Sequence, residues 1–428
     1  MVKLKRLKIN KYRNVRPGTE LRFDDGFNLV LGKNGSGKTT LLGLIAMACG
    51  WNLAELEGEE LALEFDIDAD GCRIEFILLN ERTTDASLAY SFTLLLPQDA
   101  ATLVFHGTSA SLAISVMEDK SSSRSHPPCS PFEYDFLHQL AHMLTDWARE
   151  SQAQRMGLIM TLHSLRFDVA PFRFDEALGA FYALTGQNSP PSRPAGPDSL
   201  ATTASVIAAP KTSVSINSKH SPYRFSGPFI RELVAKNPDL SPSSALSSDN
   251  LGVLTELAEL LEFAKIELRP DISAMSGTVL ARKVTIQAVK FFFYGKNGNS
   301  ISHDLLSYGQ KRVVSFFFYL YFTTPGVVIA DELVNGLHHR WIEACMEAIG
   351  DRQAFLTSQN PLLFDYIPDF TSAEQVQSRF IACKTEVVDG AEQLVWQNLS
   401  QADAEMFFDA YRAEIEPVGE ILITRGLW

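Results

Sequence analysis

The chain has 428 residues and a formal net charge of −13, with 46% hydrophobic and 21% charged residues. This balance excludes a disordered or fibrous protein, and the length allows about two or three domains. The five cysteines are scattered and form no CxxC pair, which argues against a disulfide framework or zinc ribbon and favours reduced thiols in a cytoplasm.

The N-terminal stretch MVKLKRLKINKYRN alternates apolar and basic residues, which predicts a strand and not a signal peptide. The longest apolar runs fall short of the roughly 20 residues that cross a bilayer, so no membrane segment is expected. Residues 1–22 carry a single acid, Glu20, and eight basic residues: Lys3, Lys5, Arg6, Lys8, Lys11, Arg13, Arg16 and Arg22. This basic arm fits a nucleic-acid or acidic partner and fits a charged edge strand equally well.

A strand, a glycine loop and a helix follow next along the chain. Phe27 to Leu31 is apolar on both faces, as a strand covered on both sides would be, and Lys38 to Cys49 suits a buried helix. A short strand is also expected at Glu20 to Phe23. Leu61 to Leu79 is predicted to form a hairpin around Asp68-Ala-Asp-Gly71, and a further strand is expected at Ala89 to Leu96.

The middle of the chain is less regular. Phe132 to Ala148 and Leu251 to Phe263 have helical spacing of apolar residues. The segment 186–228 is rich in proline and serine, which predicts a linker or mobile loop without a packed element. The sequence contains neither an internal repeat nor a long heptad run, which sets aside an extended coiled coil.

Alternating strands and helices return near the C-terminus. Strands are predicted at Lys283 to Tyr294, Val327 to Ala330 and Gln353 to Leu356, with helices at Gln310 to Phe322 and Ala402 to Glu414. The pattern predicts one α/β domain built from two halves, 1–119 and 264–428, around a largely helical insertion, 120–263.

The segment Gly32-Lys-Asn-Gly-Ser-Gly-Lys38-Thr39 matches GxxxxGK[ST] between a buried strand and a helix, which is the context that supports such a match. Glycines allow the backbone N–H groups to face a polyphosphate. Lys38 would reach the β- and γ-phosphates and the Thr39 hydroxyl would bind Mg²⁺. The alternative is a glycine turn that happens to precede a lysine. It is disfavoured because every constrained position of the motif is matched.

An acidic pair, Asp331 and Glu332, ends the apolar strand Val327 to Ala330. Asp331 would hold Mg²⁺ through water, and Glu332 would polarise the attacking water. Acidic residues are also common at solvated strand ends. The interpretation of this pair as a metal and water site therefore depends on the phosphate-binding loop upstream.

The segment Ser307-Tyr-Gly-Gln310 opens a predicted helix. Its hydroxyl and N–H groups would suit an anion, although an ordinary N-cap explains the serine by itself. The aromatic run Phe316 to Phe322 is apolar all around that helix, which indicates core and not a base-stacking surface.

The order of these motifs resembles the ATP-binding-cassette ATPases, and more narrowly their SMC-like and recombination-repair branch, in which an insertion splits the ATPase head. The stretch Asp331-Glu-Leu-Val-Asn-Gly-Leu-His338 is similar to head-only members found in bacterial antiphage systems, and Leu7-Lys-Ile-Asn-Lys-Tyr-Arg13 also fits that branch. The resemblance covers about the first 50 and the last 165 residues.

The resemblance implies two heads that sandwich two ATP molecules with Mg²⁺. Ser307 and Gly309 of one chain would contact the γ-phosphate held by Lys38 of the other, and Asn335 would lie in the loop that crosses between heads. Catalysis would fall to Lys38, Glu332 and Gln359, and the metal to Thr39 and Asp331. The implied nucleotide contacts are Arg13, Gly32, Asn34, Gly35, Ser36, Gly37, Lys38, Thr39, Thr40, Ser307, Gly309 and Gln310.

The chain departs from the family pattern in three ways. Gln359 stands at the switch-histidine position; its amide can donate a hydrogen bond but carries no charge, so slow or partner-gated turnover is expected. Position 339 is histidine where proline is usual, and no glutamine can be placed in the metal-contacting loop. His338 and His339 would point apart on a helix and are interpreted as structural.

The expected function is a cytoplasmic ATP hydrolase whose head dimerisation senses or restrains a separate effector, a nuclease or toxin, in antiphage defence or DNA maintenance. A homo-dimer or higher oligomer is expected, and DNA is a further candidate partner. About 100 residues follow Asp331, which leaves no room for a fused nuclease. The alternatives are a transporter ATPase subunit and a nucleotide-binding scaffold with little hydrolysis; a GTPase is disfavoured because NKxD is absent.

Overall fold

The computed structural model describes both ends of the chain and parts of its middle. The described residues are 2–50, 59–69, 72–80, 89–95, 102–108, 111–116, 123–126, 203–209, 212–217, 246–247, 252–278, 281–323, 326–367, 369–388 and 390–427. The chain divides into two compact units, and each is described by itself. The first comprises Met1–Pro171, Pro325–Leu333 and Asp351–Trp428, and the second comprises Phe172–Thr324 and Val334–Gly350.

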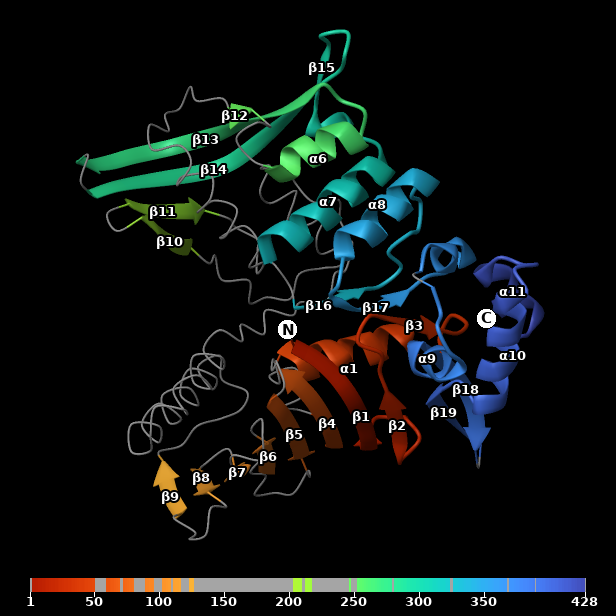
Figure 1. Ribbon diagram of the computed structural model, residues 1–428. Coiled ribbons are helices and arrows are strands. Elements are labelled where there is room, and N and C mark those ends of the chain that lie inside the picture. The colour runs from red at the N-terminus through yellow and green to blue at the C-terminus, as the bar shows by residue number, and fades with distance from the viewer. Residues whose placement is uncertain are drawn as a thin grey trace. The chain divides into compact units, whose positions relative to one another are not determined.

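The central sheet of the first unit combines strands from both ends of the chain (Figure 1). Its order is β16 (Val327–Ala330), β17 (Gln353–Thr357), β3 (Phe27–Leu31), β18 (Phe380–Val388) and β19 (Ala391–Asn398). The first four strands are parallel, and β19 is antiparallel to β18. Strands β16, β17 and β3 are buried along their whole length, as expected for nearly continuous apolar runs.

Helix α1 (Lys38–Gly50) follows β3 directly after the glycine loop, which confirms the predicted strand, loop and helix. The described residues of this unit also form α9 (Ala373–Arg379), α10 (Gln401–Arg412) and α11 (Val418–Thr424). An aromatic cluster joins α10 to β18, since the Phe407 ring lies 5.1 Å from that of Phe380 and 5.4 Å from that of Phe370. The predicted C-terminal helix is therefore present and packs on the sheet.

A second, antiparallel sheet of the first unit runs in the order β2-β1-β4-β5-β6-β7-β8-β9. The strands are β1 (Val2–Tyr12), β2 (Thr19–Arg22), β4 (Leu61–Ala69), β5 (Cys72–Asn80), β6 (Ala89–Leu95), β7 (Thr102–Thr108), β8 (Ser111–Val116) and β9 (Ser123–His126). Strands β4 and β5 form the hairpin predicted around residues 68–71. Alternate residues of β1 and β4, such as Leu7 and Phe65, are buried.

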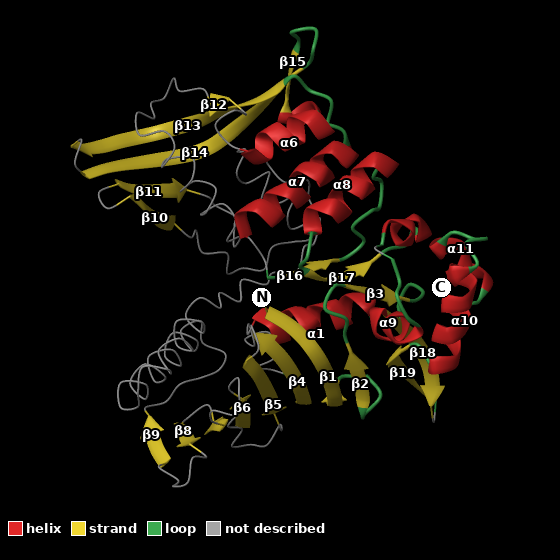
Figure 2. Ribbon diagram, viewed as in Figure 1, coloured by secondary structure: helices red, strands yellow, loops and turns green. Residues whose placement is uncertain are grey.

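The second unit contains a long antiparallel pair, β13 (Lys265–Thr278) and β14 (Ala281–Tyr294), with β15 (Ser300–Ser302) and β12 (Leu246–Ser247) alongside. Helices α6 (Gly252–Leu260), α7 (Tyr308–Thr323) and α8 (His339–Ile349) lie side by side (Figures 1 and 2). Residues 316–320 of α7 are all buried, and the Phe318 ring lies 5.5 Å from that of Phe291. The first five residues of the aromatic run are therefore core, as predicted, whereas Tyr321 is exposed.

The segment 186–228 differs from the predicted linker. Two strands, β10 (Thr203–Ala209) and β11 (Thr212–Asn217), form an antiparallel hairpin within it, and β11 pairs in parallel with β14. In the sequence the prolines of the segment lie outside these two strands, which are rich in Val, Ile, Ser and Thr. Local β-propensity therefore outweighs the overall content of breakers. The predicted helix Phe132 to Ala148 lies outside the described residues.

Candidate functional site

The loop between β3 and α1 has a curled backbone that depends on glycine. Gly32, Gly35 and Gly37 have φ angles of 144°, 83° and 83°. A Cβ on Gly32 would lie 2.3 Å from the Cys383 carbonyl oxygen, and one on Gly37 would lie 2.8 Å from Leu394 Cδ1. Gly32 and Gly37 are thus required by backbone and neighbours together, and Gly35 by its backbone alone.

Strand β19 supports this loop from within the sheet. The Trp396 side chain is buried, and its indole Nε1 donates a hydrogen bond of 3.1 Å to the Ser36 carbonyl oxygen. Leu394 of the same strand contacts the position of Gly37. Neither residue was singled out by the sequence analysis, because nothing in an amphipathic strand distinguishes a side chain that braces a distant loop.

Lys38 lies in the loop as a buried cation. Its Nζ donates to the carbonyl oxygens of Gly32 at 2.7 Å and Lys33 at 3.1 Å, and no carboxylate of the described residues forms an ion pair with it. The Ser36 hydroxyl is buried and has no hydrogen-bond partner within the described part of the chain. The first turn of α1 adds backbone N–H groups and the positive end of the helix dipole.

This set of donors fits an anion of several charges such as a triphosphate. The neighbouring Cys383 thiol does not oppose an anion, because burial raises its pKa to about 12 and keeps it neutral. Asn34 is exposed on the loop, and Thr40 lies in the first turn of α1, as their motif positions predict.

The phosphate-binding loop meets the acidic pair at the end of β16. The Thr39 hydroxyl donates a hydrogen bond of 2.6 Å to Asp331 Oδ2, although the two residues are 292 positions apart. Thr357 at the end of β17 donates its hydroxyl to the other carboxylate oxygen of Asp331. A hydroxyl beside a carboxylate offers the hard oxygen ligands that Mg²⁺ prefers, so Thr39 and Asp331 fit that metal.

Glu332 follows with a left-handed backbone, at φ 52°. Its N–H donates a hydrogen bond of 2.8 Å to the Thr357 hydroxyl, and its carboxylate accepts the amide of Gln359. The structure therefore brings Thr39, Asp331, Glu332 and Gln359 together as the motifs predict. Thr357 was missed; a polar residue that closes the apolar strand QAFLT was the available signal.

In the second unit, Ser307 and Gln310 cap helix α7. The Ser307 N–H donates to Gln310 Oε1 at 2.9 Å, and the Gln310 N–H donates to Ser307 Oγ at 3.2 Å, which forms a capping box. A Cβ on Gly309 would lie 2.9 Å from the Gly336 carbonyl oxygen. The N-cap interpretation thus holds within one chain, and the contact of these residues and Asn335 with a second head stays a prediction.

Arg13 lies at a turn after β1 with a left-handed φ of 46°. Its guanidinium donates to Glu59 Oε1 at 2.6 Å, and this hydrogen bond raises the pKa of Arg13. Val15, two residues later, bridges to Leu394, whose side chain contacts the phosphate-binding loop. Arg13 therefore lies on a segment that pairs with Leu394, the residue of β19 that contacts the phosphate-binding loop. The contact of Arg13 with a nucleotide remains a prediction.

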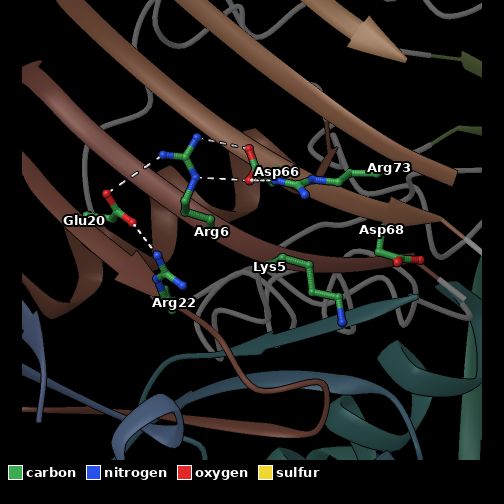
Figure 3. Close-up of a pocket in the computed structure, with 7 residues that line it drawn as sticks. All are labelled: Lys5, Arg6, Glu20, Arg22, Asp66, Asp68 and Arg73. Carbon is green, nitrogen blue, oxygen red and sulfur yellow. Dashed lines mark hydrogen bonds and ion pairs between the residues drawn. The ribbon is translucent and has the colours of Figure 1, made fainter. Parts of the chain in front are cut away.

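Arg6 and Lys8 of β1 pair with carboxylates of β4. Asp66 accepts from Arg6 Nε at 3.1 Å and from Arg73 at 3.0 Å, and Lys8 Nζ lies 2.9 Å from Glu64. A charged pocket with a volume of about 500 Å³ lies beside these ion pairs, and Figure 3 shows the residues that line it. Its lining residues are Lys5, Arg6, Glu20, Arg22, Asp66, Asp68 and Arg73. Since cations and carboxylates are interleaved there, the arm is better explained as a charged strand than as a nucleic-acid surface.

Two family models match the chain. One, described as an AAA domain, matches residues 6–100, and another, described as an AAA domain, putative AbiEii toxin, Type IV TA system, matches residues 164–365. No curated protein has a sequence that matches this chain. Among the described residues, no helix is both long enough and apolar enough to cross a lipid bilayer.

Three solved SMC heads are similar to the chain at low identity. The SMC head bound to the C-winged helix domain of ScpA is 10% identical at a TM-score of 0.39, with 93% of this chain and 99% of that chain covered. The SMC head domain from Thermotoga maritima is 12% identical at 0.33, with coverage of 93% and 99%. The SMC head from Pyrococcus furiosus bound to the C-terminal domain of ScpA is 10% identical at 0.37, with coverage of 96% and 100%.

One matched AAA model covers the phosphate-binding loop, and the other covers the acidic pair that the fold brings to it. The same order of motifs gave the family resemblance in the sequence. The chain is thus similar to AAA domains on both parts of its candidate nucleotide site.

Proposed function

We propose that the protein hydrolyses ATP and that MgATP closes a dimer of two heads. The observation that carries this proposal is the contact between Thr39 and Asp331 at 2.6 Å, which unites the two halves of a nucleotide site across 292 positions. Lys38 and the loop N–H groups would bind the triphosphate, and Thr39 and Asp331 would hold Mg²⁺. When bound, the metal supplies charge stabilisation to the reacting phosphate.

Glu332 is the proposed general base for the attacking water. Its carboxylate lies one residue past Asp331, and Gln359 donates an amide hydrogen bond to it. The amide orients the carboxylate by this hydrogen bond and leaves its second oxygen for the water. Because Gln359 brings no positive charge to the site, slow turnover is expected.

We also propose that head closure regulates a separate effector, a nuclease or toxin, in the cytoplasm. The family model over 164–365, whose description names a putative toxin of a type IV toxin–antitoxin system, supports the defence context of this proposal. Purification of the tagged protein from its native operon, with the neighbouring genes intact, is expected to recover such an effector. Recovery of this chain alone in every preparation would contradict the effector proposal and leave the ATPase proposal standing.

A nucleotide-binding scaffold with little hydrolysis is the second candidate. The contact between Gln359 and Glu332 favours it, because an amide that occupies the carboxylate competes with an attacking water. The two candidates share ATP binding and dimerisation and differ in turnover. Wild-type hydrolysis relative to a Glu332→Gln variant therefore separates them.

The test combines calorimetric ATP binding, phosphate release and light scattering. Lys38→Ala is expected to abolish ATP binding, whereas Lys33→Ala, an exposed lysine of the same loop, should retain it. Glu332→Gln is expected to bind ATP, to lower hydrolysis about 100-fold or more and to accumulate as a dimer. Wild type that binds no ATP would overturn the proposal, and wild type no faster than Glu332→Gln would select the scaffold.

A further inference from the structure

One buried hydroxyl connects the two acidic residues of the site. Thr357 closes β17 and is fully buried. Its Oγ1 accepts the Glu332 N–H at 2.8 Å and donates to Asp331 Oδ1. Since a hydroxyl has a single proton, the incoming N–H bond leaves that proton for the carboxylate, and the direction of both bonds is fixed.

The two oxygens of Asp331 have different roles in this arrangement. Oδ1 is bound by the buried Thr357, and Oδ2 faces the exposed Thr39 hydroxyl at 2.6 Å. A cation held by Thr39 and Asp331 would replace the contact with Thr39, whereas the contact with Thr357 can remain. Thr357 therefore holds the carboxylate in the same orientation with and without the metal.

The same hydroxyl also holds the backbone at Glu332. The left-handed φ of 52° at Glu332 is unfavourable for a residue that carries a side chain. The hydrogen bond from its N–H to Thr357 compensates for part of that strain. Loss of the hydroxyl would leave a partly buried N–H without its acceptor and release the turn that aims the Glu332 carboxylate.

We infer that Thr357 is a positioning residue for the metal side of the nucleotide site. It orients Asp331 for Mg²⁺ and Glu332 for the attacking water without touching either the metal or the nucleotide. The inference rests on the proposed function, because it concerns a residue that determines how tightly the proposed ATP site binds Mg²⁺. Hydrogen bonds to metal-ligating carboxylates typically change metal affinity or activity by about 10- to 100-fold.

The test compares ATP binding by calorimetry in Mg²⁺ and in EDTA. In EDTA, Thr357→Val is expected to bind ATP with the affinity of wild type. The increase in ATP affinity that Mg²⁺ produces is expected to be roughly 10- to 100-fold smaller in Thr357→Val than in wild type. Thr357→Ser, which keeps the hydroxyl, should restore that gain. Thr19→Val is the matched control, since Thr19 is a buried threonine of β2 whose hydroxyl bonds the Arg16 carbonyl oxygen at 2.7 Å, and its Mg²⁺ gain should equal that of wild type.

A full Mg²⁺ gain in Thr357→Val would overturn the inference and leave the proposed function intact. An equal loss in Mg²⁺ and EDTA would overturn it as well, because that result describes a purely structural residue. If the valine variant does not fold, Thr357→Cys gives the same comparison with a small side chain that is a poor hydrogen-bond donor. Absence of ATP binding by wild type would instead refute the proposed function itself.

Discussion

Two glycines of the phosphate-binding loop share one backbone angle and differ in their surroundings. Gly35 and Gly37 both have φ 83°. A Cβ on Gly35 would meet nothing within 4 Å, whereas one on Gly37 would lie 2.8 Å from Leu394 and 3.1 Å from Trp396. The pair therefore separates the effect of backbone strain from the effect of packing against β19.

We expect Gly35→Ala to cost about 1–2 kcal/mol of stability from the left-handed backbone alone. Gly37→Ala should cost more, because Leu394 and Trp396 must also move, and it should weaken ATP binding further by displacing the loop. Thermal unfolding and calorimetric ATP binding measure both effects. Equal losses in the two variants would show that β19 does not brace the loop.

At the scale of residues, the sequence motifs predict which side chains of the site lie together but not which other residues hold them in place. Lys38, Thr39, Asp331 and Glu332 follow from spacing, since a glycine loop and an acidic strand end have few other uses in this order. Trp396 could not be predicted in the same way, and the polar end of the strand QAFLT marks Thr357 without indicating what it contacts. Their roles depend on the neighbours of β17 and β19 in the sheet, which no local pattern in the sequence specifies.

At the scale of elements, β1 and β4 are joined by a ladder of ion pairs. Glu64 on β4 accepts from Lys8 at 2.9 Å, and this hydrogen bond is the main favourable contact that lowers the pKa of Glu64, with Asn10 and Arg6 adding to it. Since the folded pKa lies below the unfolded value, the carboxylate stabilises the fold above the unfolded pKa. This contribution is lost as the pH falls through the folded pKa.

Glu64→Gln is therefore expected to lower the apparent Tm at pH 7, and its difference from wild type should shrink below about pH 4. Circular dichroism melts at the two pH values measure this. Glu60→Gln, which removes the more exposed pair with Lys11, is the control and should change the Tm less. A difference that grows in acid would contradict the assignment.

Elements with strong local patterns could be predicted from the sequence. The strand Phe27–Leu31, helix α1 and the hairpin β4–β5 each combine an apolar run with turn residues at its ends. The hairpin β10–β11 could not, because prolines around it dominated the composition of its segment. The strand order β16-β17-β3-β18-β19 could not be predicted from the sequence either, since tertiary packing determines which parallel strands become neighbours.

At the scale of the whole molecule, the proposed dimer can be tested through Ser307. This exposed residue caps α7 through its hydroxyl, so removal of the side chain would disturb the helix as well as any contact with a second head. Aspartate and asparagine cap helices about as well as serine. A charge can therefore be added at this position while the cap is kept.

Ser307→Asp is expected to abolish ATP-dependent dimerisation by repelling the phosphates bound to the other head, with an unchanged Tm. Ser307→Asn should keep dimerisation, because it adds no charge. Light scattering with ATP, in a Glu332→Gln background that prevents turnover, measures the assembly. Normal dimerisation of the aspartate variant would rule out the proposed contact of Ser307 with the nucleotide.

The position of β3 between β17 and β18 has a consequence for synthesis of the protein. The phosphate-binding loop leaves the ribosome early, but both strands that flank β3 are translated more than 300 residues later. At the usual elongation rate this delay is on the order of 20–70 s. During that interval the nascent β3 has both edges unpaired, so the growing chain is exposed to aggregation and cannot bind ATP stably before β17 and β18 have been translated.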